Sequence, residues 1–142
     1  MRVLARTLVN LREGRMQKTL AATTAASVPA LAFEIYFEHY KGSFGDKWMW
    51  TPIALTPAVT AAGIAGVYSE KAARTWLPLF SGLYALDGAI GVITHLRGVA
   101  RKPGGFKEPL FNIVMGPPLL APGSLALVGG MGLAAAAFGR ER

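Results

Sequence analysis

Four apolar stretches, each bounded by charged loops or tails, constrain the fold of this chain more than any other feature. They run at about 19–40, 51–68, 73–95 and 110–138. A helix needs roughly 20 apolar residues to cross the hydrocarbon core of a bilayer. The pattern predicts an all-α integral membrane protein, a four-helix bundle in which residues 19–142 form one transmembrane domain.

The composition fits a chain with too little polar surface to cover a soluble domain. Hydrophobic residues make up 52% and charged residues 16%, against about 25% charged in soluble domains. The absence of cysteine excludes disulfides, iron–sulfur clusters and thiolate metal sites. The net charge of +7 lies in loops and tails. We therefore expect the bilayer and its anionic headgroups as partners, and no nucleic acid.

Residues 1–18 form a basic segment ahead of the first apolar stretch. Leu4, Leu8 and Leu11 recur at helical spacing, which predicts a short amphipathic helix on the membrane surface. The alternative is a cleaved signal peptide, since residues 30–32 (Ala-Leu-Ala) resemble a cleavage site. The long basic lead and the weakly hydrophobic residues 19–28 argue against cleavage.

The distribution of lysine and arginine predicts the orientation of the helices. The N-terminal segment, the loop after the second stretch and the C-terminus hold nine of these residues, and the opposite side holds six. Basic residues are enriched in cytoplasmic loops. We therefore expect an inner membrane of bacterial type with both termini in the cytoplasm.

The second half of the sequence resembles the first. The motif at 39–42 is His-Tyr-Lys-Gly and the motif at 95–98 is His-Leu-Arg-Gly, and each comes at the end of an apolar stretch. The stretch after each motif opens with prolines five residues apart, Pro52 and Pro57 or Pro117 and Pro122. The pattern predicts two repeated hairpins related by a pseudo-two-fold axis along the membrane normal. Chance similarity between two apolar hairpins is the alternative.

Small residues at every fourth position indicate faces where helices approach each other closely. The predicted faces are Ala58, Ala62 and Gly66 in the second stretch, and Ala126, Gly130 and Ala134 in the fourth.

The two histidines suggest a b-type haem. The repeat places His39 and His95 at the same depth, and imidazole is a common axial ligand of haem iron. Lys41 and Arg97, two residues beyond each histidine, are candidate partners of the haem propionates. The alternative is that both histidines lie at the interface and hydrogen-bond to loop carbonyls.

The acids within the apolar stretches suggest a second kind of site. Glu34 and Glu38 are one helical turn apart, and Asp87 lies within the third stretch. Together with His39 and His95, these carboxylates could hold iron, manganese or zinc. Acids inside a membrane span usually face the bundle interior, so Asp87 is also a candidate proton relay.

These features favour an accessory or anchoring subunit of a larger membrane complex, packed against other subunits or against copies of itself. With haem bound, it would transfer electrons between an extracytoplasmic redox partner and quinone or another subunit. One alternative is a small metal-dependent enzyme or ion-handling protein, so the sequence leaves enzymatic activity open. The other is a purely structural bundle, in which Gly42 and Gly98 end their helices.

Overall fold

The computed structural model describes residues 2–142, so Met1 of the predicted N-terminal segment lies outside it. The described residues are helical and contain no β-strand. Three helical segments are long and apolar enough to cross a membrane, by length and composition: Gln17–Lys41, Lys47–Tyr68 and Glu70–Ala100. These segments agree with an all-α integral membrane protein.

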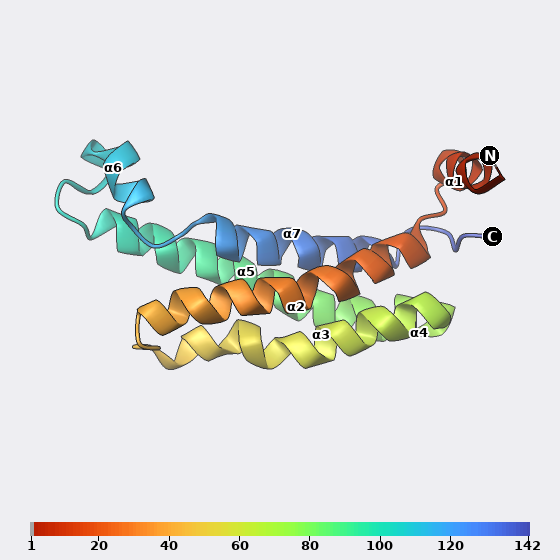
Figure 1. Cartoon of the computed structure of the whole chain (residues 1–142), viewed down its shortest axis with the longest axis horizontal. Helices are drawn as coiled ribbons and strands as arrows, with labels where there is room; N and C mark the ends of the chain where they lie inside the picture. The colour runs from red at the N-terminus through yellow and green to blue at the C-terminus, as the bar shows by residue number, and fades with distance from the viewer. Residues whose placement is uncertain (1) are drawn as a thin grey trace.

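Four helices pack side by side along the long axis of the molecule (Figure 1). Helix α2 (Gln17–Lys41) packs against α3 (Thr51–Tyr68), and α5 (Trp76–Ala100) packs against α7 (Leu120–Ala134). Helix α3 also contacts α5, and α2 also contacts α7. Both termini lie at one end of this assembly, and the loops that follow α2 and α5 lie at the other (Figure 1).

Shorter helices connect the long ones or extend from them. The 3-10 helix η1 (Lys47–Trp50) leads into α3, and α4 (Glu70–Arg74) joins α3 to α5. The loop after α5 contains η2 (Gly105–Lys107) and α6 (Pro109–Val114). Helix α1 (Arg2–Arg12) precedes α2.

The fourth apolar stretch is not one helix from 110 to 138. It is divided into α6 and α7 by residues 115–119, which include Pro117 and Pro118. Proline lacks a backbone N–H and disfavours helical geometry in the residue before it, so two consecutive prolines end the helix. Helix α7 has 15 residues, fewer than the roughly 20 that a complete crossing needs.

The third stretch is longer than its pattern predicts. Helix α5 continues past the 95–98 motif to Ala100, so Gly98 does not end it, whereas α2 does end just before Gly42. A methyl group at Gly98 would lie 2.7 Å from Cγ of Pro117. Gly98 therefore leaves room for the proline, and the two motifs have different local structures.

The interface between α5 and α7 uses glycines from both helices. A methyl group at Gly88 would lie 2.4 Å from the backbone nitrogen of Ala126, and one at Gly129 would lie 2.5 Å from that of Ala85. Gly130 belongs to the predicted small-residue face, but a methyl group added there would have no neighbouring atom within 4 Å. A helix has 3.6 residues per turn, so a stripe at every fourth position drifts around the helix and leaves the interface.

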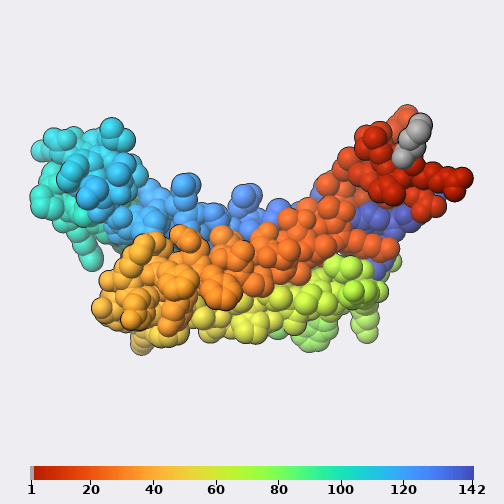
Figure 2. Space-filling model, viewed as in Figure 1, coloured from red at the N-terminus to blue at the C-terminus, as the bar shows by residue number. Residues whose placement is uncertain are grey.

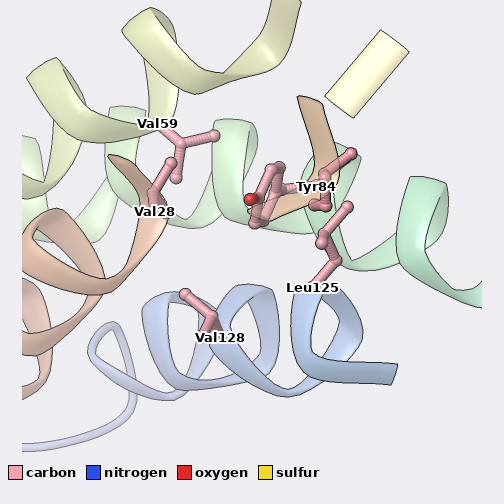
Figure 3. Close-up of a cluster of buried hydrophobic side chains, with 6 residues drawn as sticks. Val28, Val59, Tyr84, Leu125 and Val128 are labelled. Atoms are coloured by element: carbon pink, nitrogen blue, oxygen red, sulfur yellow. The ribbon is translucent and has the colours of Figure 1, made fainter. Parts of the chain in front are cut away.

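The apolar core lies in the middle of the four packed helices. Val28, Val59, Leu125 and Val128 surround the ring of Tyr84 (Figure 3). The Tyr84 side chain is fully buried, and its hydroxyl has no hydrogen-bond partner among the described residues. The centre is therefore held by packing, while the hydrogen bonds between segments lie near the two ends.

Candidate functional site

His39 lies in the last turns of α2 and is bonded to the loop that follows. Its Nδ1 atom is 2.8 Å from the carbonyl oxygen of Met49 in η1. Ser43 and Phe44 adopt positive φ angles of 56° and 48°, which turn the chain back toward α2. The side chain of Asp46 accepts a hydrogen bond from the backbone N–H of Trp48 and begins η1. The loop is built so that a backbone carbonyl faces the imidazole.

His95 makes the corresponding contact in the second hairpin. Its Nδ1 atom is 2.6 Å from the carbonyl oxygen of Pro118, in the segment just before α7. Proline has no N–H to donate, but its carbonyl is a full acceptor. Both histidines are therefore bonded to backbone carbonyls, which is the hydrogen bonding expected in the alternative to haem ligation.

These hydrogen bonds fix the tautomer of each neutral imidazole. A carbonyl can only accept, so Nδ1 carries the proton and Nε2 keeps a lone pair. Nε2 is then the nitrogen that could bind a metal. The C-terminal ends of α2 and α5, which carry the two histidines, lie at the end of the molecule opposite the termini (Figure 1).

Asp87 connects the two hairpins at this end. Its Oδ1 atom is 2.6 Å from the hydroxyl of Thr51, the first residue of α3, and that hydroxyl is also 2.8 Å from the carbonyl oxygen of Trp48. Thr51 is the donor in both contacts, and its single hydroxyl proton is shared between the Asp87 carboxylate and the Trp48 carbonyl. Asp87 is thus bound at the N-terminal end of another helix, which is a favourable position for an acid.

The remaining predicted ligands do not converge on this pair of histidines. Glu34 is exposed, and Glu38 forms an ion pair with Lys41 on the same helix. Arg97 is exposed on α5. Within residues 2–142, no group of three or more His, Asp or Glu side chains is placed to hold a metal ion. The structure therefore does not gather the five-residue metal site suggested by the sequence.

Two open grooves lie on the outside of the helices, and neither is lined by a histidine. The first, of about 360 Å³, is apolar and lies along α7 beside the start of α2, and Gly130 and Ala134 are among its lining residues. The second, of about 330 Å³, lies between α3 and α5, and its polar lining is Thr51 and Asp87. Gly130 and Ala134, predicted to lie where helices approach each other closely, line the first groove.

A polar cluster at the terminal end is absent from the sequence-based expectations. We call Gln17, Arg140 and Glu141 the terminal clasp. The Arg140 guanidinium donates to the side-chain oxygen of Gln17 and to the carbonyl oxygens of Gly66 and Val67 in the last turn of α3. Gln17 donates to the carbonyl of Ala135. The clasp therefore satisfies carbonyls at helix ends that would otherwise lack partners.

Glu141 binds the N-terminal end of a helix, whereas Arg140 binds the C-terminal end of another. Its carboxylate accepts hydrogen bonds of 2.6 and 2.7 Å from the backbone N–H groups of Lys18 and Thr19, in the first turn of α2. Burial alone would raise the pKa of Glu141, but the hydrogen bonds from Thr19 and Lys18 hold that pKa below its ordinary value. The sequence shows only charged residues in a short tail, with no signal of their partners.

Asn112 of α6 is a further residue that pattern reasoning missed. It is buried, and its side-chain nitrogen donates to the carbonyl oxygens of Pro103 (3.0 Å) and Gly105 (2.7 Å). These bonds hold the long loop after α5 in one conformation. A single asparagine between apolar neighbours in the sequence is the only hint of this role.

Comparison with known proteins gives no match to a family model, to a curated protein or to a solved structure.

Proposed function

We propose that this protein is an accessory or anchoring subunit of a larger membrane complex. The observation that carries the proposal is how its polar side chains are used. His39, His95, Asp87 and the terminal clasp are each bound to a helix end or a loop of the same chain. Large apolar side chains instead cover the outside of the long helices, as on Phe33, Leu86 and Leu127. Such a molecule offers surface to partner helices and lipid rather than a reaction centre.

The proposal includes α7 as a fourth crossing, with both termini in the cytoplasm, and a repeat relation between the two hairpins. The packing of α7 against α5 and α2 supports the fourth crossing. The neighbouring bilayer would have to thin beside this helix, since about 15 residues extend roughly 22 Å. The corresponding histidine-to-carbonyl bonds in the two hairpins support the repeat.

Native electrophoresis of membranes solubilised in a mild detergent tests the anchoring role. We expect the protein in a band well above the mass of one 15.0 kDa chain in its micelle, with a second polypeptide in constant ratio. A band that contains only this chain would indicate a homo-oligomer. Recovery as a monomer in every mild detergent would contradict the proposal.

A second candidate function is electron transfer through a b-type haem between His39 and His95. The observation in its favour is the pair of Nδ1 hydrogen bonds, which leaves Nε2 of each imidazole as a ligand. Electrons would then pass between an extracytoplasmic redox partner and quinone or another subunit.

An absorption spectrum of the purified protein, oxidised and then reduced with dithionite, tests the haem candidate. Bound haem gives a Soret band that shifts on reduction, and this band should be lost in His95→Ala but not in Thr94→Ala, whose side chain is exposed. A featureless spectrum from cells supplied with haem would exclude this function. Metal analysis of the same sample would test the remaining alternative, a non-haem metal site.

A further inference from the structure

Helix α1 is an amphipathic element that the other described residues leave uncovered. None of its residues is buried, and Leu4, Leu8 and Leu11 are 66%, 58% and 48% exposed. In Figure 1 the helix is seen nearly end-on beside the two termini, so its axis runs across the long axis of the molecule. Figure 2 shows it standing away from the packed helices. It therefore has an apolar face without a partner in the part of the chain that the structure describes.

The charges of α1 indicate what that partner is. Leu4, Leu8 and Leu11 fall within about 60° of one another around the helix, while Arg2 and Arg6 point about the opposite way. Arg12 lies between the two faces, and α1 has no acidic residue. An apolar face with arginines behind and beside it is typical of helices that lie in the headgroup region. Arginine side chains can extend from such a helix to lipid phosphates.

The C-terminal tail holds α1 in its crosswise position. Gly14, with φ of 66°, adopts the left-handed conformation that turns the chain between α1 and α2. Gly139 donates to the carbonyl of Gly14 (3.0 Å) and accepts from the backbone N–H of Gln17 (3.1 Å). Gly139 is thus pinned between the linker and α2, next to the terminal clasp. The direction of α1 is fixed by the tail rather than by burial of α1 itself.

We propose that α1 is a preoriented membrane-surface helix that binds anionic phospholipid headgroups, with the C-terminal tail as the element that positions it. The occupant is the lipid leaflet at the end of the molecule where both termini lie. Binding inserts Leu4, Leu8 and Leu11 among the acyl chains and places the arginines at lipid phosphates. The assignment of α1 to lipid binding does not depend on which partner subunit the long helices anchor.

The absence of cysteine allows a direct test with the full chain. Single variants Leu8→Cys, on the apolar face, and Asn10→Cys, on the polar face, are labelled with an environment-sensitive fluorophore. The proteins are placed in nanodiscs of phosphatidylcholine with or without phosphatidylglycerol. We expect blue-shifted emission and quenching by spin-labelled lipid at position 8 but not at position 10, and a larger effect with phosphatidylglycerol.

Matched charge variants separate lipid binding from a change of net charge. Replacing Arg2, Arg6 and Arg12 by glutamine should weaken insertion on the order of a hundredfold, since each cation near an anionic surface contributes about 1 kcal/mol. The control replaces three exposed cations at the other end, Arg97, Arg101 and Lys107, and should leave the signal unchanged. Equal loss in both variants would overturn the assignment.

Two further outcomes would also contradict the proposal. Emission at position 8 typical of water in both lipid mixtures would show that α1 does not insert. A blue shift without quenching by spin-labelled lipid would identify a protein as the occupant. Deletion of residues 139–142 should reduce quenching at position 8, and unchanged quenching would refute the positioning role of the tail.

Discussion

The two ends of this molecule use hydrogen bonds for different purposes. At the terminal end, Arg140 and Glu141 come from the second hairpin and bind helices of the first. At the histidine end, His39 and His95 each bind a carbonyl within their own hairpin. Within residues 2–142, the contact between Thr51 and Asp87 is the one side-chain hydrogen bond that joins the hairpins there. The terminal end therefore fixes how the hairpins pack, and the histidine end fixes the conformations of the loops.

The largest expected effect is at the terminal clasp. Arg140→Met removes hydrogen bonds to Gln17, Gly66 and Val67 and leaves two helix-end carbonyls without this partner. Hydrogen bonds to charged groups contribute roughly 1.5–3 kcal/mol each, so we expect a loss of about 3 kcal/mol in unfolding free energy. Unfolding in mixed detergent micelles measures this change. Arg97→Met, at an exposed site, should leave stability unchanged; an equal loss in both variants would remove the difference between the ends.

A smaller effect is expected where the hairpins meet at the histidine end. Thr51→Val keeps the shape of the side chain but deletes the hydroxyl that contacts Asp87 and Trp48. The unfolding free energy should fall by about 1–2 kcal/mol, because the half-buried Asp87 loses a partner. Thr94→Val is the control, since Thr94 bonds only to Ile90 of its own helix. No loss in Thr51→Val would mean that the hairpins are held together at the terminal end alone.

The pH dependence of stability tests the second part of the clasp. The folded pKa of Glu141 is lowered, and the unfolded value is about 4.3. Its stabilisation is therefore fully present above about pH 4.3 and is lost as the pH falls through the lowered folded pKa. Glu141→Gln should cost about 1 kcal/mol at neutral pH, as loss of a helix cap does, and nothing in strong acid. If the difference in unfolding free energy between the original protein and Glu141→Gln did not change with pH, this role would be contradicted.

The smallest change in global stability is expected for His39→Ala. The bond between His39 and Met49 holds a loop rather than the two hairpins, so the unfolding free energy should change by less than about 1 kcal/mol. Backbone amides of residues 42–50 should instead exchange faster with deuterium, because local opening becomes easier. Exchange at the amides of the loop at 101–119, which Asn112 stabilises, is the internal reference. A large global loss would show that both ends hold the hairpins together.

Pattern reasoning was reliable where periodicity and hydropathy specify an element. Three apolar segments are long enough to cross a membrane, and α1 is a helix with one apolar face. It was wrong about the fourth stretch, because a hydropathy average does not register the break at Pro117 and Pro118. It was also wrong about Gly98 as a helix end, since the glycine is needed for the approach of Pro117.

For the candidate site, sequence identified the side chains but not their partners. His39, His95 and Asp87 were singled out as polar residues in or beside apolar stretches. Their acceptors and donors are backbone carbonyls and a hydroxyl supplied by other segments. A carbonyl is present at every residue, so nothing in the sequence distinguishes Met49 or Pro118. The role of the site therefore could not be read from the residues alone.

The sequence by itself determined helices long and apolar enough to cross a membrane, because apolar length and the need to satisfy every backbone group within a bilayer leave few other structures. Tertiary structure decided which polar groups meet. Arg140 reaches Val67, and Glu141 reaches Thr19, only because the hairpins pack side by side and return the tail to the start of α2. Contacts between residues so distant in sequence depend on packing geometry, which hydropathy and helical periodicity do not encode.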